Sequence, residues 1–131
     1  MSKRRKGVII VLVIVVIAII LMVVFIGGRM REQTKSLPFS EISTAEVADG
    51  VYRGKAETAL VKAEVEVTVE GRQIINIDIL RHDTGTGQKA EAIVDQMQER
   101  NTWEVDGVSG ATFSSEVIKS AVNQALESGR E

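Results

Sequence analysis

The first pattern along the chain is an apolar run from Val8 to Ile26 that contains no charged or polar side chain. At about 1.5 Å of rise per residue, a helix of this length spans about 30 Å, the thickness of the hydrocarbon core of a bilayer. Val and Ile dominate the run, yet a helix is the only single segment that satisfies its own backbone groups in lipid. The pattern therefore predicts a transmembrane helix over residues 8–26.

Apolar and polar residues alternate strictly in a segment near the middle of the chain. From Val61 to Glu70, apolar and polar residues alternate without a break, which is typical of a strand with one buried and one solvated face. The apolar positions are Val61, Ala63, Val65, Val67 and Val69. After a turn at Gly71-Arg72, residues 73–80 predict a second strand, with Ile75, Ile77 and Ile79 pointing inward. The two strands predict a hairpin, and residues 49–56 predict a turn that leads into another short strand.

Helical spacing appears twice near the C-terminus. Apolar residues at i, i+3, i+4 and i+7 predict a helix over residues 89–100, and a similar stripe predicts a helix over residues 114–127, capped by Ser114 and ended by Gly129. The two stripes are Ala90, Ile93, Val94 and Met97, then Val117, Ile118, Ala121, Val122 and Ala125. Between the helices, residues 103–105 predict a short strand.

These elements predict an α+β fold: a small antiparallel sheet with helices packed on one face, preceded by a single N-terminal transmembrane helix. Residues 27–47 are polar, contain the only proline and show no sustained period, which favours a stalk or linker. The expected organisation is therefore a basic N-terminus (1–7), a transmembrane helix (8–26), a stalk (27–47) and a domain (48–131). A domain of about 80 residues without disulfides has a marginal core, which a tightly attached ligand would stabilise.

Charge on the two flanks of the apolar run predicts its orientation. Residues 3–6 are all Lys or Arg, whereas the far flank carries only Arg29, Arg31 and Lys35 with Glu32 among them. The positive-inside rule places the N-terminus in the cytoplasm and the domain outside it, in a single-pass protein of the cell membrane. A cleaved signal peptide is the rival interpretation. It would have a shorter apolar region and a small-residue cleavage site, which Gly27-Gly28-Arg29 does not supply.

Composition then narrows the classes of partner and site. Residues 29–131 hold 12 of the 16 basic residues and all 18 acidic ones, a formal charge of 12 − 18 = −6. An acidic domain argues against nucleic acid and against flat binding to anionic lipid. The absence of cysteine excludes lipoprotein attachment, disulfides and thiolate metal sites. There is one histidine, no phosphate-binding P-loop and no pair of carboxylates singled out by spacing, so we assign no catalytic residue and no metal site.

One stretch, DGVSGATFSS, combines two glycines and four hydroxyl residues just before the last predicted helix, at residues 106–115. Glycines permit a turn and hydroxyls cap helices, so an ordinary turn and cap is one interpretation. The other depends on position. Free N–H groups and the helix dipole at a helix N-terminus favour a phosphate, and Gly110 and Ala111 are small enough to let a molecule approach the Thr112 hydroxyl.

The heptad Asp106–Thr112 resembles the flavinylation motif Asp-x-x-Ser/Thr-Gly-Ala-Thr/Ser of the FMN-binding domain family. This family includes the C subunit of the sodium-pumping NADH:quinone oxidoreductase, the G subunit of the Rnf complex and many small membrane-anchored envelope proteins. The resemblance implies that Thr112 carries FMN through a phosphodiester bond. It also implies a partner, a flavin transferase that uses FAD and Mg²⁺ and recognises Asp106, Ser109, Gly110 and Ala111.

The resemblance covers residues 49–127, in the order opening strand, hairpin, loop, helix, motif and helix. In larger relatives, a loop of the acidic-Thr-Pro-Gly type after the hairpin helps to hold the flavin. The segment from Asp83 to Gly87 occupies that place without a proline. By resemblance, Thr84, Gly85 and Gly87 are further cofactor-binding candidates. His82 is either a cofactor-binding residue near the flavin ring or phosphate, or a solvated histidine of the loop. Trp103 and Phe113 are either core aromatics or residues that stack on the flavin ring.

The leading functional interpretation is a membrane-anchored, extracytoplasmic flavoprotein that relays electrons between a membrane-linked donor and an acceptor. It predicts an electron-transfer protein or a subunit of a redox complex more than a stand-alone enzyme. Two alternatives keep the fold. One is a reductase that binds FMN reversibly, and the other is a non-redox envelope module that binds a protein partner.

Overall fold

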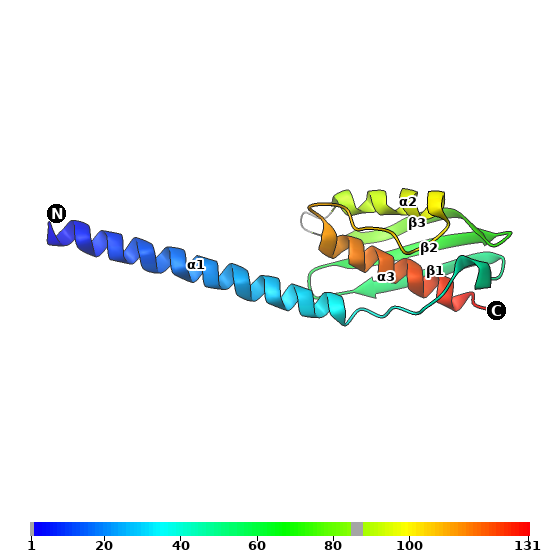
Figure 1. The fold of residues 1–131 in the computed structure, drawn as a ribbon, viewed down its shortest axis with the longest axis horizontal. Coiled ribbons are helices and arrows are strands. Elements are labelled where there is room, and N and C mark those ends of the chain that lie inside the picture. Colours follow the sequence, from blue (N-terminus) through cyan, green and yellow to red (C-terminus); the bar gives the residue numbers. More distant parts are fainter. Residues whose placement is uncertain (1, 85–87) are drawn as a thin grey trace. The chain divides into compact units, whose positions relative to one another are not determined.

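The computed structural model describes residues 2–84 and 88–131. It divides into two compact units, residues 1–32 and residues 33–131. The first unit contains most of a single helix, and the second contains a sheet with helices on it (Figure 1).

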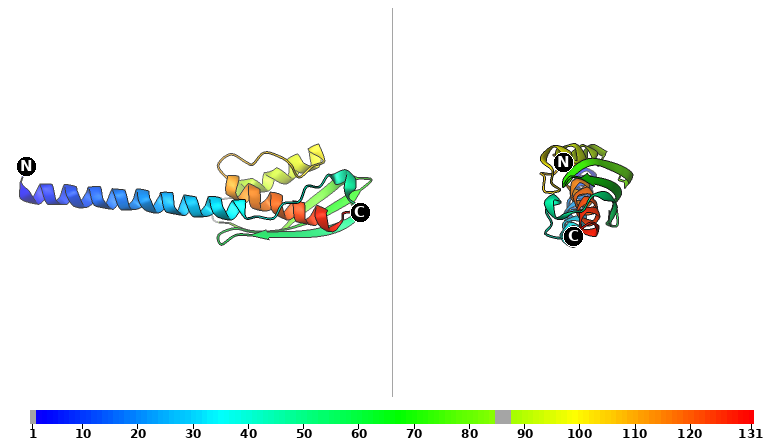
Figure 2. Two further views of the ribbon diagram at one scale, coloured as in Figure 1. Left: turned by 60° about the horizontal axis from the view of Figure 1, so that its bottom comes forward. Right: turned by 90° about the vertical axis from the view of Figure 1, so that its right-hand side faces the viewer.

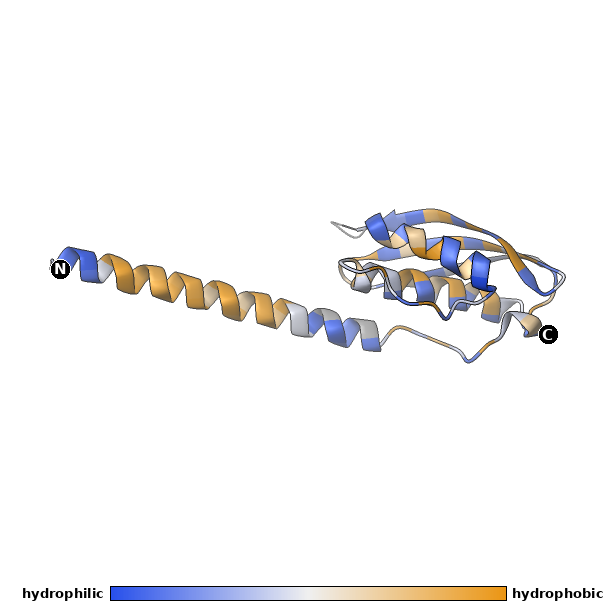
Figure 3. Cartoon of the chain, turned by 45° about the horizontal axis from the view of Figure 1, so that its top comes forward, coloured by the Kyte–Doolittle hydropathy of each residue, from blue (hydrophilic) through white to orange (hydrophobic). Residues whose placement is uncertain are grey.

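Helix α1 spans Lys3–Lys35 and contains the whole apolar run. Figure 3 shows that this run forms a continuous hydrophobic stretch of the helix, flanked by hydrophilic residues. Its large apolar side chains are exposed, from 40% at Ile26 to 66% at Val24, so no packing within this chain buries them. Among the described residues, α1 is the one helix whose length and composition would allow it to cross a membrane.

The sheet has three antiparallel strands in the order β1-β2-β3 within the described chain: β1 (Gly50–Glu57), β2 (Lys62–Glu70) and β3 (Gln73–Asp83). The hairpin predicted from the alternating pattern is confirmed, because β2 and β3 pair along their length. Gly71 and Arg72 connect them with φ angles of 60° and 62°, the left-handed pair that a two-residue hairpin turn of type I′ requires.

Two β-bulges in β3 change which side chains face the core. Val69 pairs with Ile74 and Thr68 pairs with Asn76, so Ile75 is an extra residue between them. The prediction that Ile75 points inward is therefore wrong: it is 49% exposed, and Ile74 takes the inner position at 5%. A second bulge leaves Leu80 as an extra residue, 46% exposed, between the pairs of Val65 and Glu64.

Helices cover one face of the sheet, as predicted (Figure 2). Helix α3 (Thr112–Ser128) packs across β1 and β2, and α2 (Ile93–Arg100) packs on β3. A short 3₁₀ helix, η2 (Gln88–Ala92), precedes α2 and packs against α3. The predicted helix over residues 89–100 is thus a 3₁₀ turn followed by two turns of α-helix. The strand predicted over residues 103–105 is wrong, because the Val105 N–H donates to the Trp103 carbonyl in a tight bend.

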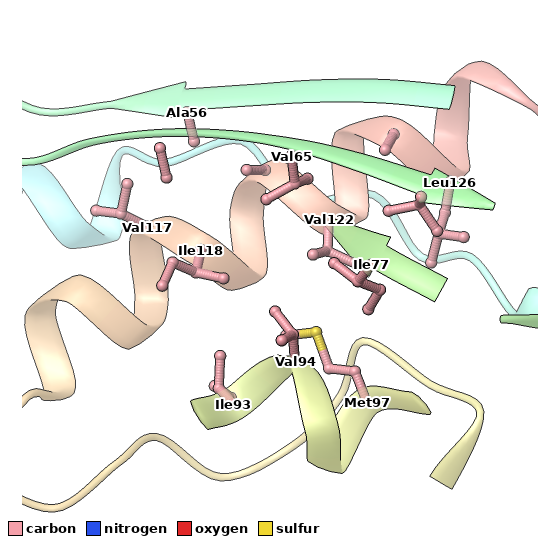
Figure 4. Close-up of a cluster of buried hydrophobic side chains, with 14 of the residues drawn as sticks. Ala56, Val65, Ile77, Ile93, Val94, Met97, Val117, Ile118, Val122 and Leu126 are labelled. Atoms are coloured by element: carbon pink, nitrogen blue, oxygen red, sulfur yellow. The ribbon is translucent and has the colours of Figure 1, made fainter. Parts of the chain in front are cut away.

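The core lies between the sheet and these helices. Its members come from the alternating face of the sheet and from the two predicted helical stripes, which are fully buried. Figure 4 shows this contact, with Val65 and Ile77 from the sheet, Met97 from α2, and Ile118 and Val122 from α3. The helix can approach β1 closely only because Gly54 has no side chain. A Cβ there would lie 1.8 Å from the Ala121 carbonyl oxygen and 2.6 Å from the Ala125 nitrogen.

An extended segment, residues 37–47, runs along α3 before the sheet begins. Its buried residues are Leu37, Ile42, Thr44 and Val47. Buried polar side chains of α3 hold its backbone: the Ser120 hydroxyl donates to the Pro38 carbonyl at 2.7 Å, and Asn123 exchanges two 2.8 Å hydrogen bonds with the backbone of Ser40. We call this segment the strap. Its last turn is the 3₁₀ helix η1 (Thr44–Glu46), capped by Ser43.

Candidate functional site

The loop between α2 and α3 carries the heptad that the sequence singled out. We call residues 106–111 the motif loop. The Ala111 N–H donates to the Val108 carbonyl at 2.9 Å, which closes a turn, and Gly110 occupies the left-handed region with φ of 82°. The loop is thus an ordered turn whose tip, Ser109 and Gly110, is exposed.

Thr112 is the first residue of α3, and it is exposed. The residue before it, Ala111, is buried and has no side chain that could accept a hydrogen bond from the first turn. The first turn also contains no acidic residue. The helix of 17 residues therefore presents N–H groups and the positive end of its dipole without a side-chain cap, beside an exposed hydroxyl.

The prediction that Ser114 caps this helix is wrong. Ser114 lies inside the first turn and is 3% exposed. Its Oγ lies 3.0 Å from the Oγ1 of Thr84, the residue that follows β3. This contact joins two parts of the chain that are 30 residues apart, so the end of β3 and the start of α3 meet at one edge of the domain.

His82 is turned inward by the bulge at Leu80. It pairs with Ala63, whose side chain is buried in the core, and the His82 side chain is only 1% exposed. Its Nδ1 lies 3.2 Å from the Oε1 of Glu91 in η2, and since a carboxylate only accepts, Nδ1 carries the hydrogen. Its Nε2 is buried and has no hydrogen-bond partner among the described residues. An enclosed polar atom of this kind costs about 1–3 kcal/mol unless something else supplies a partner.

Glu91 is a site residue that the sequence did not indicate. It lies nine residues after His82, in a polar stretch where its charge looks like part of a solvated face. Only the bulge and the packing of η2 on α3 bring its carboxylate to the imidazole. The half-exposed carboxylate orients the His82 ring from the outside, which leaves Nε2 as the free atom on the inside.

The other site residues predicted from the sequence lie in different parts of the structure. His82 and Thr84 lie at the end of β3, and Thr84 contacts Ser114 in the helical turn that Thr112 begins. Gly85 and Gly87 lie outside the described residues. Asp106 is exposed in the motif loop and has no ion pair in the part of the chain that the structure describes.

The aromatic candidates contact the domain itself. The Trp103 ring stacks on Phe39 of the strap with centroids 5.4 Å apart, and its Nε1–H donates to the Ile42 carbonyl at 2.9 Å. Phe113 is partly buried against the core. Trp103 is therefore part of the contact that holds the strap.

Charges near the end of β3 lie on the outer face of the sheet. Arg81 and Asp83 form an exposed ion pair of 2.6 Å. The hydrogen bond from Arg81 lowers the pKa of the Asp83 carboxyl below its ordinary value, and the same contact raises the pKa of Arg81. Within the described residues, no group of three or more His, Asp or Glu side chains could hold a metal ion. The site thus combines an uncapped helix end, an exposed hydroxyl and a buried imidazole.

Comparison with known families places the domain. A family model described as "FMN-binding domain" matches residues 61–127. The matched range runs from the residue before β2 to the last turn of α3, and it contains the end of β3, η2, the motif loop and Thr112.

Proposed function

The chain belongs to the FMN-binding domain family, and from this premise we propose that it is a membrane-anchored flavoprotein that carries FMN covalently on Thr112. In this proposal the flavin relays electrons between a membrane-linked donor and an acceptor outside the cytoplasm. The observation that carries the covalent attachment is the exposed Thr112 hydroxyl at the uncapped N-terminus of α3.

The residues present fit an attached FMN in two independent ways. The first turn of α3 lacks a side-chain cap because Ala111 stands at the cap position, so a phosphate ester on Thr112 would accept hydrogen bonds from N–H groups that have no side-chain acceptor in this chain. The buried Nε2 of His82 also lacks a partner within the described chain, and a flavin or its phosphate would supply one. An alanine cap and an orphaned imidazole atom are both costly in a protein that binds nothing.

The roles that we assign follow from these positions. The N–H groups of the first turn would bind the phosphate of the ester, and Ser109 and Gly110 would form the exposed tip that a transferase recognises together with Asp106. His82 and Thr84 would help to hold the cofactor from the end of β3, and Glu91 orients His82. FMN supplies the redox chemistry when it is bound, and the protein supplies attachment, orientation and electrostatic surroundings.

The attachment step requires FAD and a transferase with Mg²⁺. The Oγ1 of Thr112 forms a bond to the phosphorus of the FMN half of FAD, and the bond from that phosphorus to the bridging pyrophosphate oxygen breaks. AMP leaves with the bridging oxygen, and the hydroxyl proton passes to a base or to water. Exposure of Thr112 at the end of a helix is what an external enzyme needs in order to reach it.

Helix α1 supports a membrane location for the domain. Its apolar length matches a bilayer, and the basic residues 3–6 favour an N-terminus in the cytoplasm. The domain would then lie outside the cytoplasm, where a dissociated cofactor would be lost. Covalent attachment would prevent the cofactor from dissociating.

Mass spectrometry tests the proposal directly. The full chain is produced with and without a flavin transferase, and the peptide that contains Thr112 is examined. We expect one added FMN less one water on Thr112, none on the Thr112→Ala variant, and retention of the modification by Thr112→Ser. Because Thr112 is exposed, Thr112→Ala should change the free energy of unfolding of the unmodified chain by less than about 0.5 kcal/mol.

Two other outcomes would replace the proposal. An unmodified Thr112 on a yellow chain whose flavin separates in denaturant would favour reversible FMN binding by a reductase. A colourless chain after production with the transferase would favour a non-redox envelope module.

A further inference from the structure

Ser115 lies one helical turn after Thr112, and its hydroxyl makes hydrogen bonds to the backbone of the motif loop. The residue is fully buried. Its Oγ accepts a hydrogen bond from the Val108 N–H at 2.9 Å and donates one to the Ala111 carbonyl at 2.8 Å. The hydroxyl therefore connects the two ends of the loop tip to the body of α3.

Together with the turn, these bonds fix residues 108–111 of the motif loop. The Ala111 N–H donates to the Val108 carbonyl at 2.9 Å, so Val108 and Ala111 are bonded to each other and to Ser115, with the exposed tip, Ser109 and Gly110, between them. Gly107 packs over Ser115 closely enough that a Cβ there would lie 3.3 Å from the Ser115 Cβ. The Ser115 side chain thus has little room for another arrangement.

From this network we propose that Ser115 is a positioning residue for flavin transfer: it holds the motif loop in the conformation in which Thr112 is presented. The inference rests on the proposed function and goes beyond the motif, which ends at Thr112. An enzyme that modifies an exposed loop must hold it in one conformation. A loop already ordered by its own domain reduces the conformational entropy lost on binding.

The position of Ser115 determines which kinetic constant should respond. The residue is buried and both of its hydroxyl bonds go to the backbone of the loop, so it acts through the loop's conformation. If only a fraction of the chains has a competent loop, the apparent affinity falls by that fraction, while the chemical step in the bound complex is unchanged. Loss of the hydroxyl should therefore raise KM and leave kcat alone.

The experiment uses the full chain in detergent micelles as the substrate of a purified flavin transferase, with FAD and Mg²⁺. Initial rates of covalent FMN incorporation are measured at varied chain concentration. For Ser115→Ala we expect KM to rise about tenfold, the effect of one lost buried hydrogen-bonding group, and kcat to stay within about twofold. In the unmodified chain, amide hydrogen exchange at Val108 should accelerate by a similar factor.

Ser120→Ala is the matched control. Ser120 lies in the same helix, is also fully buried, and also donates a hydrogen bond to a backbone carbonyl, that of Pro38 at 2.7 Å in the strap. It therefore loses a similar bond without touching the motif loop. We expect wild-type KM, wild-type kcat and unchanged exchange at Val108 for this variant.

Each outcome decides the inference. If Ser115→Ala is modified with wild-type KM, or if it lowers kcat and leaves KM unchanged, the positioning role is overturned. If the wild-type chain takes up no FMN at all, the proposed function fails and the inference falls with it. If Ser115→Ala does not fold, Gly107→Ala replaces it, because its Cβ displaces Ser115 by a few tenths of an ångström and should give the same rise in KM.

Discussion

The C-terminal end of α3 is closed by groups of the chain itself, whereas its N-terminal end is not. At the C-terminal end, the Gly129 N–H donates to the Leu126 carbonyl, its own carbonyl accepts from Ala48, and Arg130 pairs with Glu127 at 2.7 Å. Along the same half, Ser120 and Asn123 hold the strap. At the other end, Ala111 supplies no cap, and Thr112 is exposed beside it.

The two ends of α3 therefore have different roles: the C-terminal half stabilises the fold, and the N-terminal end carries the candidate attachment site. Groups in the C-terminal half are buried, paired and in contact with β1 and the strap, so changes there should lower the free energy of unfolding. At the N-terminal end, Thr112 and the loop tip are exposed, so changes to those residues should alter flavin attachment with little effect on stability. The helix dipole is positive at the N-terminal end, and that end also lacks a side-chain cap, so it is the end of α3 that suits a phosphate.

The largest expected effect comes from Gly54→Ala in β1. The new Cβ would meet backbone atoms of Ala121 and Ala125, which cannot rotate away, so α3 must move from the sheet. We expect a loss of about 3 kcal/mol in the free energy of unfolding. Chemical denaturation of the full chain in micelles, followed by Trp103 fluorescence, measures it.

Gly28→Ala is the control for Gly54→Ala, since a Cβ at Gly28 has open space around it. It should leave the unfolding of the domain unchanged. Where Gly54→Ala is folded, it should still accept FMN on Thr112. A stable Gly54→Ala that cannot be modified would contradict the division between the two ends.

A smaller effect is expected from Asn123→Ala. The variant loses both hydrogen bonds to the backbone of Ser40 and leaves that backbone without its partner, which should lower the free energy of unfolding by about 2 kcal/mol. Protease resistance of the strap should fall with it. Gln124→Ala, which removes one bond to Pro38 from a partly exposed side chain, should cost clearly less. Equal losses for the two variants would argue against the strap being held by Asn123.

The smallest effect is expected from Asp83→Asn, next to Thr84. The Arg81 contact lowers the pKa of Asp83 in the folded chain, so its contribution is present above the unfolded pKa, about 3.9, and is lost as pH falls through the lower folded pKa. Because the pair is exposed, we expect a thermal midpoint within about 2 °C of wild type at pH 7 and no difference below that window. Thermal unfolding as a function of pH, at low and high salt, measures it.

Asp78→Asn is the matching control on the same strand, because Asp78 has no ion pair in the described part of the chain. A pH-independent loss of stability in Asp83→Asn, absent from Asp78→Asn, would indicate that Asp83 has a structural contact beyond Arg81.

Much of the fold could be predicted because its elements have regular periods. The alternation from Val61 to Val69 placed every apolar residue of β2 correctly, and the stripe from Val117 to Ala125 is buried as expected. Periodicity failed at Ile75, where a bulge shifts the strand by one residue. A bulge is an extra residue in one strand relative to its partner, so it depends on how the two strands pair and the sequence of one strand does not reveal it.

The candidate site could also be predicted only in part from the sequence. The heptad is contiguous, so the sequence could indicate Thr112 and its neighbours, and the family match covers them. The burial of His82 depends on the second bulge, its contact with Glu91 depends on the packing of η2, and the role of Ser115 depends on a turn that returns to α3. None of these contacts leaves a local pattern.

The sequence by itself thus determined the hairpin, the buried faces of β2 and α3, the apolar helix and the contiguous motif, because each follows from local spacing and local chemistry. Only the tertiary structure decided that the start of α3 stays uncapped while its end is closed. It also decided that Ser114 contacts Thr84 and that the strap lies along Ser120 and Asn123. Those contacts join residues that are far apart in the chain, and hydrogen bonds between distant residues form only where packing brings a donor and an acceptor within about 3 Å.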